Sequence, residues 1–253
     1  MSATGVVAAL EFEAQGLGTR QRRSGGLSGL TDGSLVSVSG IGGDNAARAA
    51  RQLVAAGVGA LLSWGVAGAL DPALSCGTVV LPTEVLRRSN ALGPSPLQRF
   101  ETCPTWRERL WAALQTHARL AAGALLTSAV PVAAAELKAR MFQETRAVAV
   151  DMESAAVAEV AADHGLPFMA LRVILDTARV SLPESIMRAF EPAAAGRSGL
   201  RRAWPLLRPL LNAPADWGPL LRLAGQYRVA RRALSDCARR AEPTRLTQRP
   251  GGR

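Results

Sequence analysis

Residues 149–178, AVDMESAAVAEVAADHGLPFMALRVILDTA, contain the pattern that decides the fold. The segment begins at the end of an apolar run, 146–151, that is typical of a strand. Apolar residues at helical spacing follow over 152–165 and end at Gly165, a residue common at helix C-termini. Residues 166–178 then form a nearly continuous apolar strand that ends in Asp176. Because such a strand needs cover on both faces, the segment predicts a sheet between two layers of helices.

The same alternation continues outward in both directions and predicts an α/β domain. A glycine-rich turn at 40–45 opens a helix, with Asp44 as its N-cap, and GALLSWGVAGAL at 59–70 is a strand running into a second glycine turn. The other expected strands and helices lie at 4–10, 34–38, 77–82, 122–128, 104–119, 132–142 and 219–240.

Composition excludes several classes of protein. The chain has 253 residues, 48% of them hydrophobic, which is enough to bury a core without a disulfide framework. Cys76, Cys103 and Cys237 are far apart and in no CxxC pair, so we expect reduced thiols and no cysteine-rich metal site. The start, MSATGVVAAL, lacks the basic region of a signal peptide, and no apolar run approaches about 18 residues. We therefore expect a cytoplasmic protein.

The charge is divided very unevenly along the chain. Residues 196–253 carry thirteen arginines against three acidic residues, which accounts for the whole net charge of +10, whereas residues 1–195 are neutral. We predict two parts: a catalytic domain at 1–195 and an Arg-rich, partly helical extension at 196–253 whose end is disordered. Such an extension can bind nucleic acid, bind anionic lipid, or simply be solvated.

The candidate chemistry rests on carboxylates, because the sequence has no GxxxxGK[ST] loop, HExxH or GxSxG motif. Glu13 follows the first strand, Glu153 starts a helix, and Asp176 ends an apolar strand. An Asp after ALRVIL is desolvated, which can raise its pKa enough to hold a proton near neutrality. The alternative for Glu153 and Asp151 is helix capping, since negative charge is favoured at a helix N-terminus. Glu11 should point to the opposite face from Glu13 if the strand continues.

Two glycine turns are candidate ligand sites. Gly40-Ile41-Gly42-Gly43-Asp44-Asn45 nearly matches the dinucleotide fingerprint, with Asn45 in place of the last glycine. It supports only a distant alternative, a nucleotide-dependent oxidoreductase. Gly65-Val66-Ala67-Gly68 ends a buried strand, where α/β sheets form ligand crevices, although a plain turn is equally compatible.

Together, GVVAALEFEA (5–14), SGIGGDNAA (39–47), LLSWGVAGALDPALSCGTVVLP (61–82) and the segment at 149–178 resemble the nucleoside phosphorylase/nucleosidase family. The similarity is greatest to the methylthioadenosine/S-adenosylhomocysteine nucleosidase branch and spans residues 5 to about 180. It implies a three-layer αβα nucleoside-phosphorylase-like fold with a central mixed sheet, extended here by the basic helical segment. It also implies cleavage of the N-glycosidic bond of an adenine nucleoside, with no cofactor and no metal.

The resemblance assigns roles to individual residues. Asp176 corresponds to the acid that protonates purine N7, and Glu13 to the carboxylate that activates the attacking water. Met152 and Glu153 correspond to the pair that holds the sugar. The remaining substrate-binding positions implied by the match are Gly42, Gly65, Val66 and Ala67.

Within the family, the chain looks most like the hopanoid-associated phosphorylases, which are proposed to release adenine from adenosylhopane. The shortened middle, Trp64 and the Arg/Trp/Leu-rich extension carry this likeness. It favours phosphorolysis slightly, with inorganic phosphate as co-substrate. Ser63, however, replaces a phosphate-binding Arg of many phosphorylases, and Val66 and Leu175 replace polar residues. Arginines at 20–23 or 87–88 could substitute, and a hydrolytic nucleosidase acting on methylthioadenosine or S-adenosylhomocysteine stays the alternative.

The expected partners follow from the same reading. We expect a small adenine nucleoside, which can be lipid-linked, no nucleic acid, and a homodimer. Trp204, Leu206, Leu207 and Trp217 stand beside arginines in the extension, so we also expect an anionic membrane surface, on the inner face of the membrane. The alternative for the stripe Leu220–Cys237 is an ordinary last helix packed on the enzyme body. A non-enzymatic adaptor with a basic tail is the third class of function.

Overall fold

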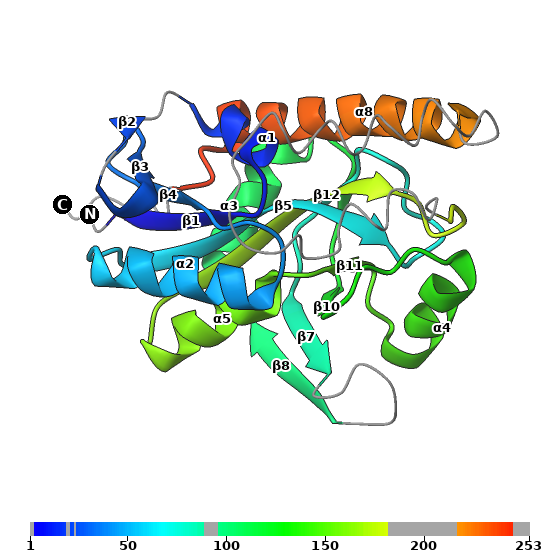
Figure 1. Ribbon diagram of the computed structural model, residues 1–253, viewed down its shortest axis with the longest axis horizontal. Helices are drawn as coiled ribbons and strands as arrows, with labels where there is room; N and C mark the ends of the chain where they lie inside the picture. Colours follow the sequence, from blue (N-terminus) through cyan, green and yellow to red (C-terminus); the bar gives the residue numbers. More distant parts are fainter. Residues whose placement is uncertain (1–2, 19–20, 23, 89–95, 182–216, 245–253) are drawn as a thin grey trace.

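The computed structural model describes residues 3–18, 21–22, 24–88, 96–181 and 217–244, and every structural statement below concerns these residues. A central sheet lies between two layers of helices (Figure 1). Helices α2 (Gly43–Ala55) and α5 (Ser154–Asp163) cover one face, and α3 (Pro104–Leu114) and α8 (Trp217–Ala241) cover the other. The expected three-layer α/β fold is therefore confirmed.

The sheet mixes parallel and antiparallel pairs. Its main path is β2-β3-β4-β1-β5-β11-β10-β7-β8, while β12 pairs with β5 and β6, and β6 with β9. The bounds of these strands are β1 Thr4–Ala8, β2 Gln21–Arg22, β3 Leu27–Gly29, β4 Leu35–Val38, β5 Ala60–Ala69, β6 Val79–Val80, β7 Glu84–Arg88, β8 Leu97–Glu101, β9 Leu120–Ala121, β10 Ala124–Thr127, β11 Ala149–Asp151 and β12 Phe168–Asp176. The shorter helical elements are α1 (Glu11–Ala14), η1 (Gln15–Leu17), η2 (Ser24–Gly26) and α4 (Ala135–Thr145).

Strand β5 is the centre of this arrangement because three strands pair with it. Its first half runs parallel to β1, its last residues pair antiparallel with β11, and β12 runs parallel to it along most of its length. Elements from both ends of the chain therefore meet along β5.

Strand β12 shows why the apolar segment decides the fold. Met169, Leu171 and Val173 pack in the core beneath α3 and α8, whereas Ala170 and Ile174 pack in the core beneath α2 and α5. With both faces buried, every residue of the strand up to Ile174 needs a side chain that fits a core. Arg172 is the exception, and it lies on the α5 side.

Three local expectations were wrong. Strand β1 ends at Ala8 and the chain turns into α1, so Glu11 lies on a helix rather than on an extended strand. The stretch Gly65–Gly68 is not a turn but part of the continuous strand β5. The N-cap of α2 is Gly42, and Asp44 falls in the first turn of the helix. Gly42 has φ 100°, a conformation that glycine adopts without steric cost.

Other expected elements exist with shifted ends. The helix expected at 104–119 ends at Leu114, the one at 132–142 is α4, and the strands expected at 77–82 and 122–128 shorten to β6 and β10. The Gly/Arg-rich stretch at 16–33 contains β2 and β3, which extend the sheet beyond β4.

Helix α8 runs along the outer face of the sheet, in contact with β12, η1 and α3 (Figure 1). Ala230, Leu234 and Cys237 are buried there, so this part of the stripe packs on the enzyme body. No helix in the described ranges is long and apolar enough to cross a bilayer. The expected boundary at 195/196 and the segment 201–208 lie outside the described residues.

Candidate active site

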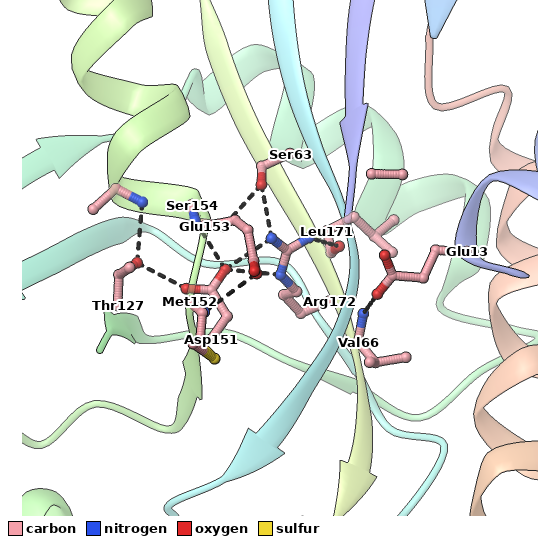
Figure 2. Close-up of polar contacts among 12 residues, drawn as sticks. Glu13, Ser63, Val66, Thr127, Asp151, Met152, Glu153, Ser154, Leu171 and Arg172 are labelled. Atoms are coloured by element: carbon pink, nitrogen blue, oxygen red, sulfur yellow. Dashed lines mark hydrogen bonds and ion pairs between the residues drawn. The ribbon is translucent and has the colours of Figure 1, made fainter. Parts of the chain in front are cut away.

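Glu13 lies on α1, directly after β1, and its carboxyl group is held against β5. It is 3% exposed. Its Oε1 accepts a hydrogen bond from the Val66 N–H (Figure 2) and its Oε2 accepts one from the Leu10 N–H, each at 2.9 Å. A Cβ on Gly65 would lie 2.4 Å from Oε1, so only glycine permits this approach. Gly65 therefore makes room for the Glu13 carboxyl group, and Val66 binds it.

The surroundings of Glu13 favour proton transfer. Burial raises the pKa of the Glu13 carboxyl above its ordinary value, while the charge of Arg172 and the backbone N–H groups of Val66 and Leu10 counteract this rise. A carboxyl with a raised pKa, held in one orientation by two backbone donors, has the properties of a general base.

Glu153 connects the other glycine turn to the same region. It is the N-cap residue of α5, and its carboxyl accepts hydrogen bonds from the Gly42 N–H at 2.8 Å and the Met152 N–H at 3.3 Å. Burial, followed by the negative charge of Asp151, raises the pKa of Glu153 to about 7. Gly42 thus contacts Glu153, a candidate substrate-binding residue, directly, and Met152 is half-buried beside Glu153.

A buried polar network stands behind these carboxyls, and most of it was missed in the sequence. Arg172 donates to Asp151 Oδ2 through Nε at 2.9 Å and to Ser63 Oγ at 2.7 Å. Thr127 Oγ1 donates to Asp151 Oδ1 at 2.7 Å, and Ser154 Oγ is 3.1 Å from Ser63 Oγ (Figure 2). Arg172 is 2% exposed, and these partners fix its guanidinium in place.

A sequence signal for this network did exist. A single arginine inside the apolar run ALRVIL must find a buried counter-charge, since an isolated buried charge is very costly. Asp151, at the end of its own buried strand, is the partner that this reasoning predicts. From the sequence, Ser63 was expected only to stand in place of a phosphate-binding arginine. In the structure it has a role of its own, because it accepts a hydrogen bond from Arg172.

Asp176 lies at a bulge at the end of β12. Ile174 pairs with Ala67 and Asp176 with Gly68, so Leu175 is the extra residue on this strand. A bulge re-aims the side chains that follow it. The Asp176 carboxyl lies over Gly68, 3.2 Å from the position that a Cβ would take there, and it is 5% exposed. Burial raises its pKa, while the ammonium of Lys138 on α4 lowers it.

Lys138 was also missed in the sequence. It is fully buried and forms an ion pair with Asp176 Oδ2. The sequence signal is that Lys138 is the only lysine in a chain with 30 basic residues. All other basic residues are arginines, so a lysine at this position indicates a site that suits a compact ammonium and not a planar guanidinium.

The structure thus brings most of the predicted site residues together along β5. Glu13 contacts Gly65 and Val66, Asp176 lies at Gly68, and the two contacted positions are about 7 Å apart along the strand. Glu153, Met152 and Gly42 approach from the α5 side. Ala67 is different: its side chain packs in the core beneath α2 and α5.

The site is made of carboxyl groups, backbone N–H groups and apolar walls. Within the described ranges, no group of three His, Cys, Asp or Glu side chains is arranged to hold a metal ion. Two buried carboxyls with raised pKa values, Glu13 and Asp176, allow acid–base chemistry on a substrate bound over β5. Fold and site together define an α/β protein whose buried carboxyl groups are suited to acid–base chemistry.

Comparisons with known proteins identify the family. The family model of the phosphorylase superfamily matches residues 27–199. The 5'-methylthioadenosine/S-adenosylhomocysteine nucleosidase of Treponema pallidum is 28% identical over 196 residues, which are 64% of this chain and 73% of that protein. The nucleosidase of Neisseria meningitidis in complex with methylthio-immucillin-A superposes with a TM-score of 0.61 at 26% identity, covering 70% of this chain and 87% of that one. A methylthioadenosine nucleosidase structure from Weissella paramesenteroides covers 81% of this chain and 96% of that one, with a TM-score of 0.63 at 25% identity.

The chain belongs to the phosphorylase superfamily. It is an enzyme that cleaves N-glycosidic bonds.

Proposed function

We propose that this enzyme cleaves the N-glycosidic bond of an adenine nucleoside and releases adenine. The observation that carries the proposal is the placement of two buried carboxyls, Glu13 and Asp176, against the same stretch of β5, at Val66 and Gly68. The nucleosidase relatives named above support the choice of an adenine nucleoside.

The residue types suit this reaction. A purine anion is a poor leaving group, so an acid must protonate the base, and Asp176 has this role in our proposal. The sugar becomes oxocarbenium-like, and Glu153 accepts hydrogen bonds from its hydroxyl groups. Glu13 takes a proton from the nucleophile. Positioned acid catalysis contributes about 10²–10⁴-fold to such a rate.

Water is the nucleophile that the contacts favour, in contrast to the slight lean to phosphate in the sequence. Three arginines in the described part of the chain that could bind a phosphate are paired with other residues: Arg172 with Asp151 and Ser63, Arg87 with Glu159, and Arg88 with Glu144. Phosphate is a second candidate, supported by the likeness to the hopanoid-associated phosphorylases. Arg20 and Arg23, and the side chain of Arg22, lie outside the described residues.

The substituent on the nucleoside 5' carbon is the finer part of the proposal. Phe12, Val66 and Leu175 are half-buried apolar residues next to Glu13 and Asp176, and Phe12 packs edge-on against Tyr227 of α8 at 4.7 Å. Apolar walls at these positions support an apolar substituent, with adenosylhopane as the lipid-linked candidate. The alternative substrate class is methylthioadenosine or S-adenosylhomocysteine.

An adenine-release assay tests the proposal. Adenosine, 5'-methylthioadenosine, S-adenosylhomocysteine and a 5'-alkyl adenosine are compared, each with and without inorganic phosphate. Adenine together with free sugar in phosphate-free buffer supports hydrolysis, and a sugar 1-phosphate made only with phosphate supports the second candidate. Absence of adenine from all four substrates contradicts the proposed function.

Glu13→Gln separates the two nucleophiles further. If water attacks, the variant loses activity by about 10²-fold or more, because the amide cannot accept the proton of the water, and added phosphate does not restore it. Activity that is near normal in this variant would exclude Glu13 as the base.

We also propose that the enzyme is a homodimer and that its extension meets an anionic membrane surface. Support for the second part is the concentration of positive charge in residues 196–253. Light scattering on the purified chain measures the first property, and the vesicle experiment for the second is argued at the end of the Discussion.

A further inference from the structure

Lys138 has an unusual position for a lysine. Its side chain is fully buried, although lysine is almost never fully buried unless it is paired. It reaches from α4 to the end of β12, where its partner lies 38 residues further along the sequence. Its partner there is Asp176, the proposed acid.

The Lys138 ammonium has three oxygen partners. Nζ donates to Asp176 Oδ2, to the Thr177 carbonyl oxygen at 3.1 Å and to the Val180 carbonyl oxygen at 2.9 Å. An ammonium has three N–H donors and no acceptor. Three oxygen acceptors therefore match the protonated form, and the two carbonyls hold the ammonium in place independently of Asp176.

We propose that Lys138 is the positioning residue for Asp176: its ammonium holds Oδ2 of the carboxyl group, so that Oδ1 is presented to the purine. This inference rests on the proposed function. The proton moves from Oδ1 of Asp176 to N7 of the base as the glycosidic electron pair goes to the base, and Lys138 keeps its own protons throughout. The carboxylate that results is stabilised by the adjacent positive charge.

The surroundings of Asp176 make Lys138 the group that tunes it. From β12 itself, Arg172 is bound to Asp151. From β5 and α1, Glu13 is held by Val66 and Leu10. From the loop before β6 comes the Cys76 thiol, whose pKa is raised by burial and by the negative charge of Asp176, so this thiol is neutral at the pH of an assay.

The sign of the expected pH effect follows directly. Burial raises the pKa of Asp176 and the Lys138 charge lowers it. If that charge is removed, Asp176 keeps its proton to higher pH, by about 1–3 pH units for a close charge pair. The alkaline limb of the kcat/KM profile then moves upward, while kcat falls because the carboxyl has lost the donor that orients it.

The test compares Lys138→Met with the matched control Arg140→Met. Arg140 also carries positive charge on α4, but it is 69% exposed and pairs with Glu144. In Lys138→Met we expect kcat lower by about 10- to 100-fold, a smaller change in KM, and an alkaline limb shifted upward by about one pH unit or more. Arg140→Met keeps the wild-type profile. A kcat within two-fold of wild type, or a lower kcat with an unmoved limb, would overturn the proposal, because a purely structural lysine changes the amount of active enzyme and not its pH profile.

A second variant covers the case in which Lys138→Met does not fold. Lys138→Arg keeps the positive charge but replaces the single nitrogen that donates to three acceptors. We therefore expect the alkaline limb of the kcat/KM profile to stay at its wild-type pH, and kcat to be lower than in the wild type. Wild-type kcat in Lys138→Arg contradicts positioning. An inactive wild-type enzyme on every adenine nucleoside would instead count against the proposed function. In that case the proposal is judged by a carbon-detected NMR titration of the Asp176 carboxyl group, which should titrate at higher pH in Lys138→Met, and an equal midpoint overturns it.

Discussion

Asp151 and Asp176 are both buried aspartates at strand ends, yet their partners give them different properties. Arg172 binds Asp151 through Nε and a terminal nitrogen, and Thr127 and Ser154 donate to it as well, so Asp151 is a fully bonded carboxylate. Asp176 has the single ammonium of Lys138, and burial raises its pKa. The first arrangement suits a structural ion pair, and the second suits a group that exchanges a proton.

Asp176→Asn tests the acid role. The amide keeps the shape of the side chain but has no acidic proton, so adenine release should fall by about 10²-fold or more. Circular dichroism should show an unchanged fold. Turnover close to that of wild type would remove Asp176 from this role.

Glu153 predicts a pH dependence of stability. Its pKa of about 7 in the folded protein lies above the ordinary value of 4.5, so the folded state holds this proton more tightly than the unfolded state. Stability from this group is therefore complete below about pH 4.5 and is lost as the pH rises to about 7, at ~1.4 kcal/mol per pKa unit. Glu153→Gln should remove this loss, so that its melting temperature relative to wild type is higher at pH 8 than at pH 5. A difference that stays constant from pH 5 to pH 8 would contradict the assigned pKa.

At the scale of elements, the sequence predicted the order of strands and helices better than their ends. The 30-residue segment at 149–178 is almost entirely buried, and its apolar periodicity leaves little choice of structure. The stretch Gly65–Gly68 gave a wrong answer because glycine is typical of turns. Here glycine serves the close approach of the Glu13 and Asp176 carboxyls, which come from elements far away in the sequence. The positions of these carboxyl groups also depend on residues far away in the sequence, such as Lys138 and Arg172. A local sequence pattern does not contain such partners.

Gly65→Ala tests this explanation of the strand. The new Cβ would meet Glu13 Oε1, and the carboxyl would have to give up its bond to Val66. We expect adenine release to fall by about 10²-fold, the cost of misplacing a catalytic group by about 1 Å. Gly225→Ala on α8 is the control, because no atom lies within 4 Å of its added Cβ, and it should keep full activity and gain about 0.5–1 kcal/mol of stability. Equal activity in the two variants would show that Glu13 does not depend on this approach.

At the scale of the whole molecule, the end of the chain is part of the enzyme body. The Trp106 indole donates to the Pro243 carbonyl at 2.9 Å, and the Thr4 hydroxyl donates to the Thr244 carbonyl at 2.6 Å. Leu234 and Cys237 fill the core above β12. The two ends of the described chain are thus tied together, and the basic extension contains a helix that covers this face of the sheet together with α3.

Truncation near Ala195 should therefore destabilise the protein. It exposes the core beneath α8 and removes side chains such as Leu234, each worth about 1.5–3 kcal/mol when buried. We expect the shortened chain to melt far below the full chain or to aggregate, as measured by thermal unfolding. A shortened chain with the melting temperature of the full chain would show that α8 adds nothing to the body.

The membrane proposal must for this reason be tested on the full chain. Arg228, Arg231 and Arg232 are exposed on α8, whereas Arg201, Arg202 and Arg208 stand in sequence among Trp204, Leu206 and Leu207. Charge next to apolar anchors defines an interfacial segment, and each basic residue near an anionic surface contributes about 1 kcal/mol. We expect the full chain to sediment with anionic vesicles at low salt and not with neutral vesicles. Replacing Arg201, Arg202 and Arg208 by Gln should reduce sedimentation more than the same change at Arg228, Arg231 and Arg232. An equal reduction in both triple variants would mean that net charge alone attracts the protein, and no reduction in either would exclude the membrane surface as a partner.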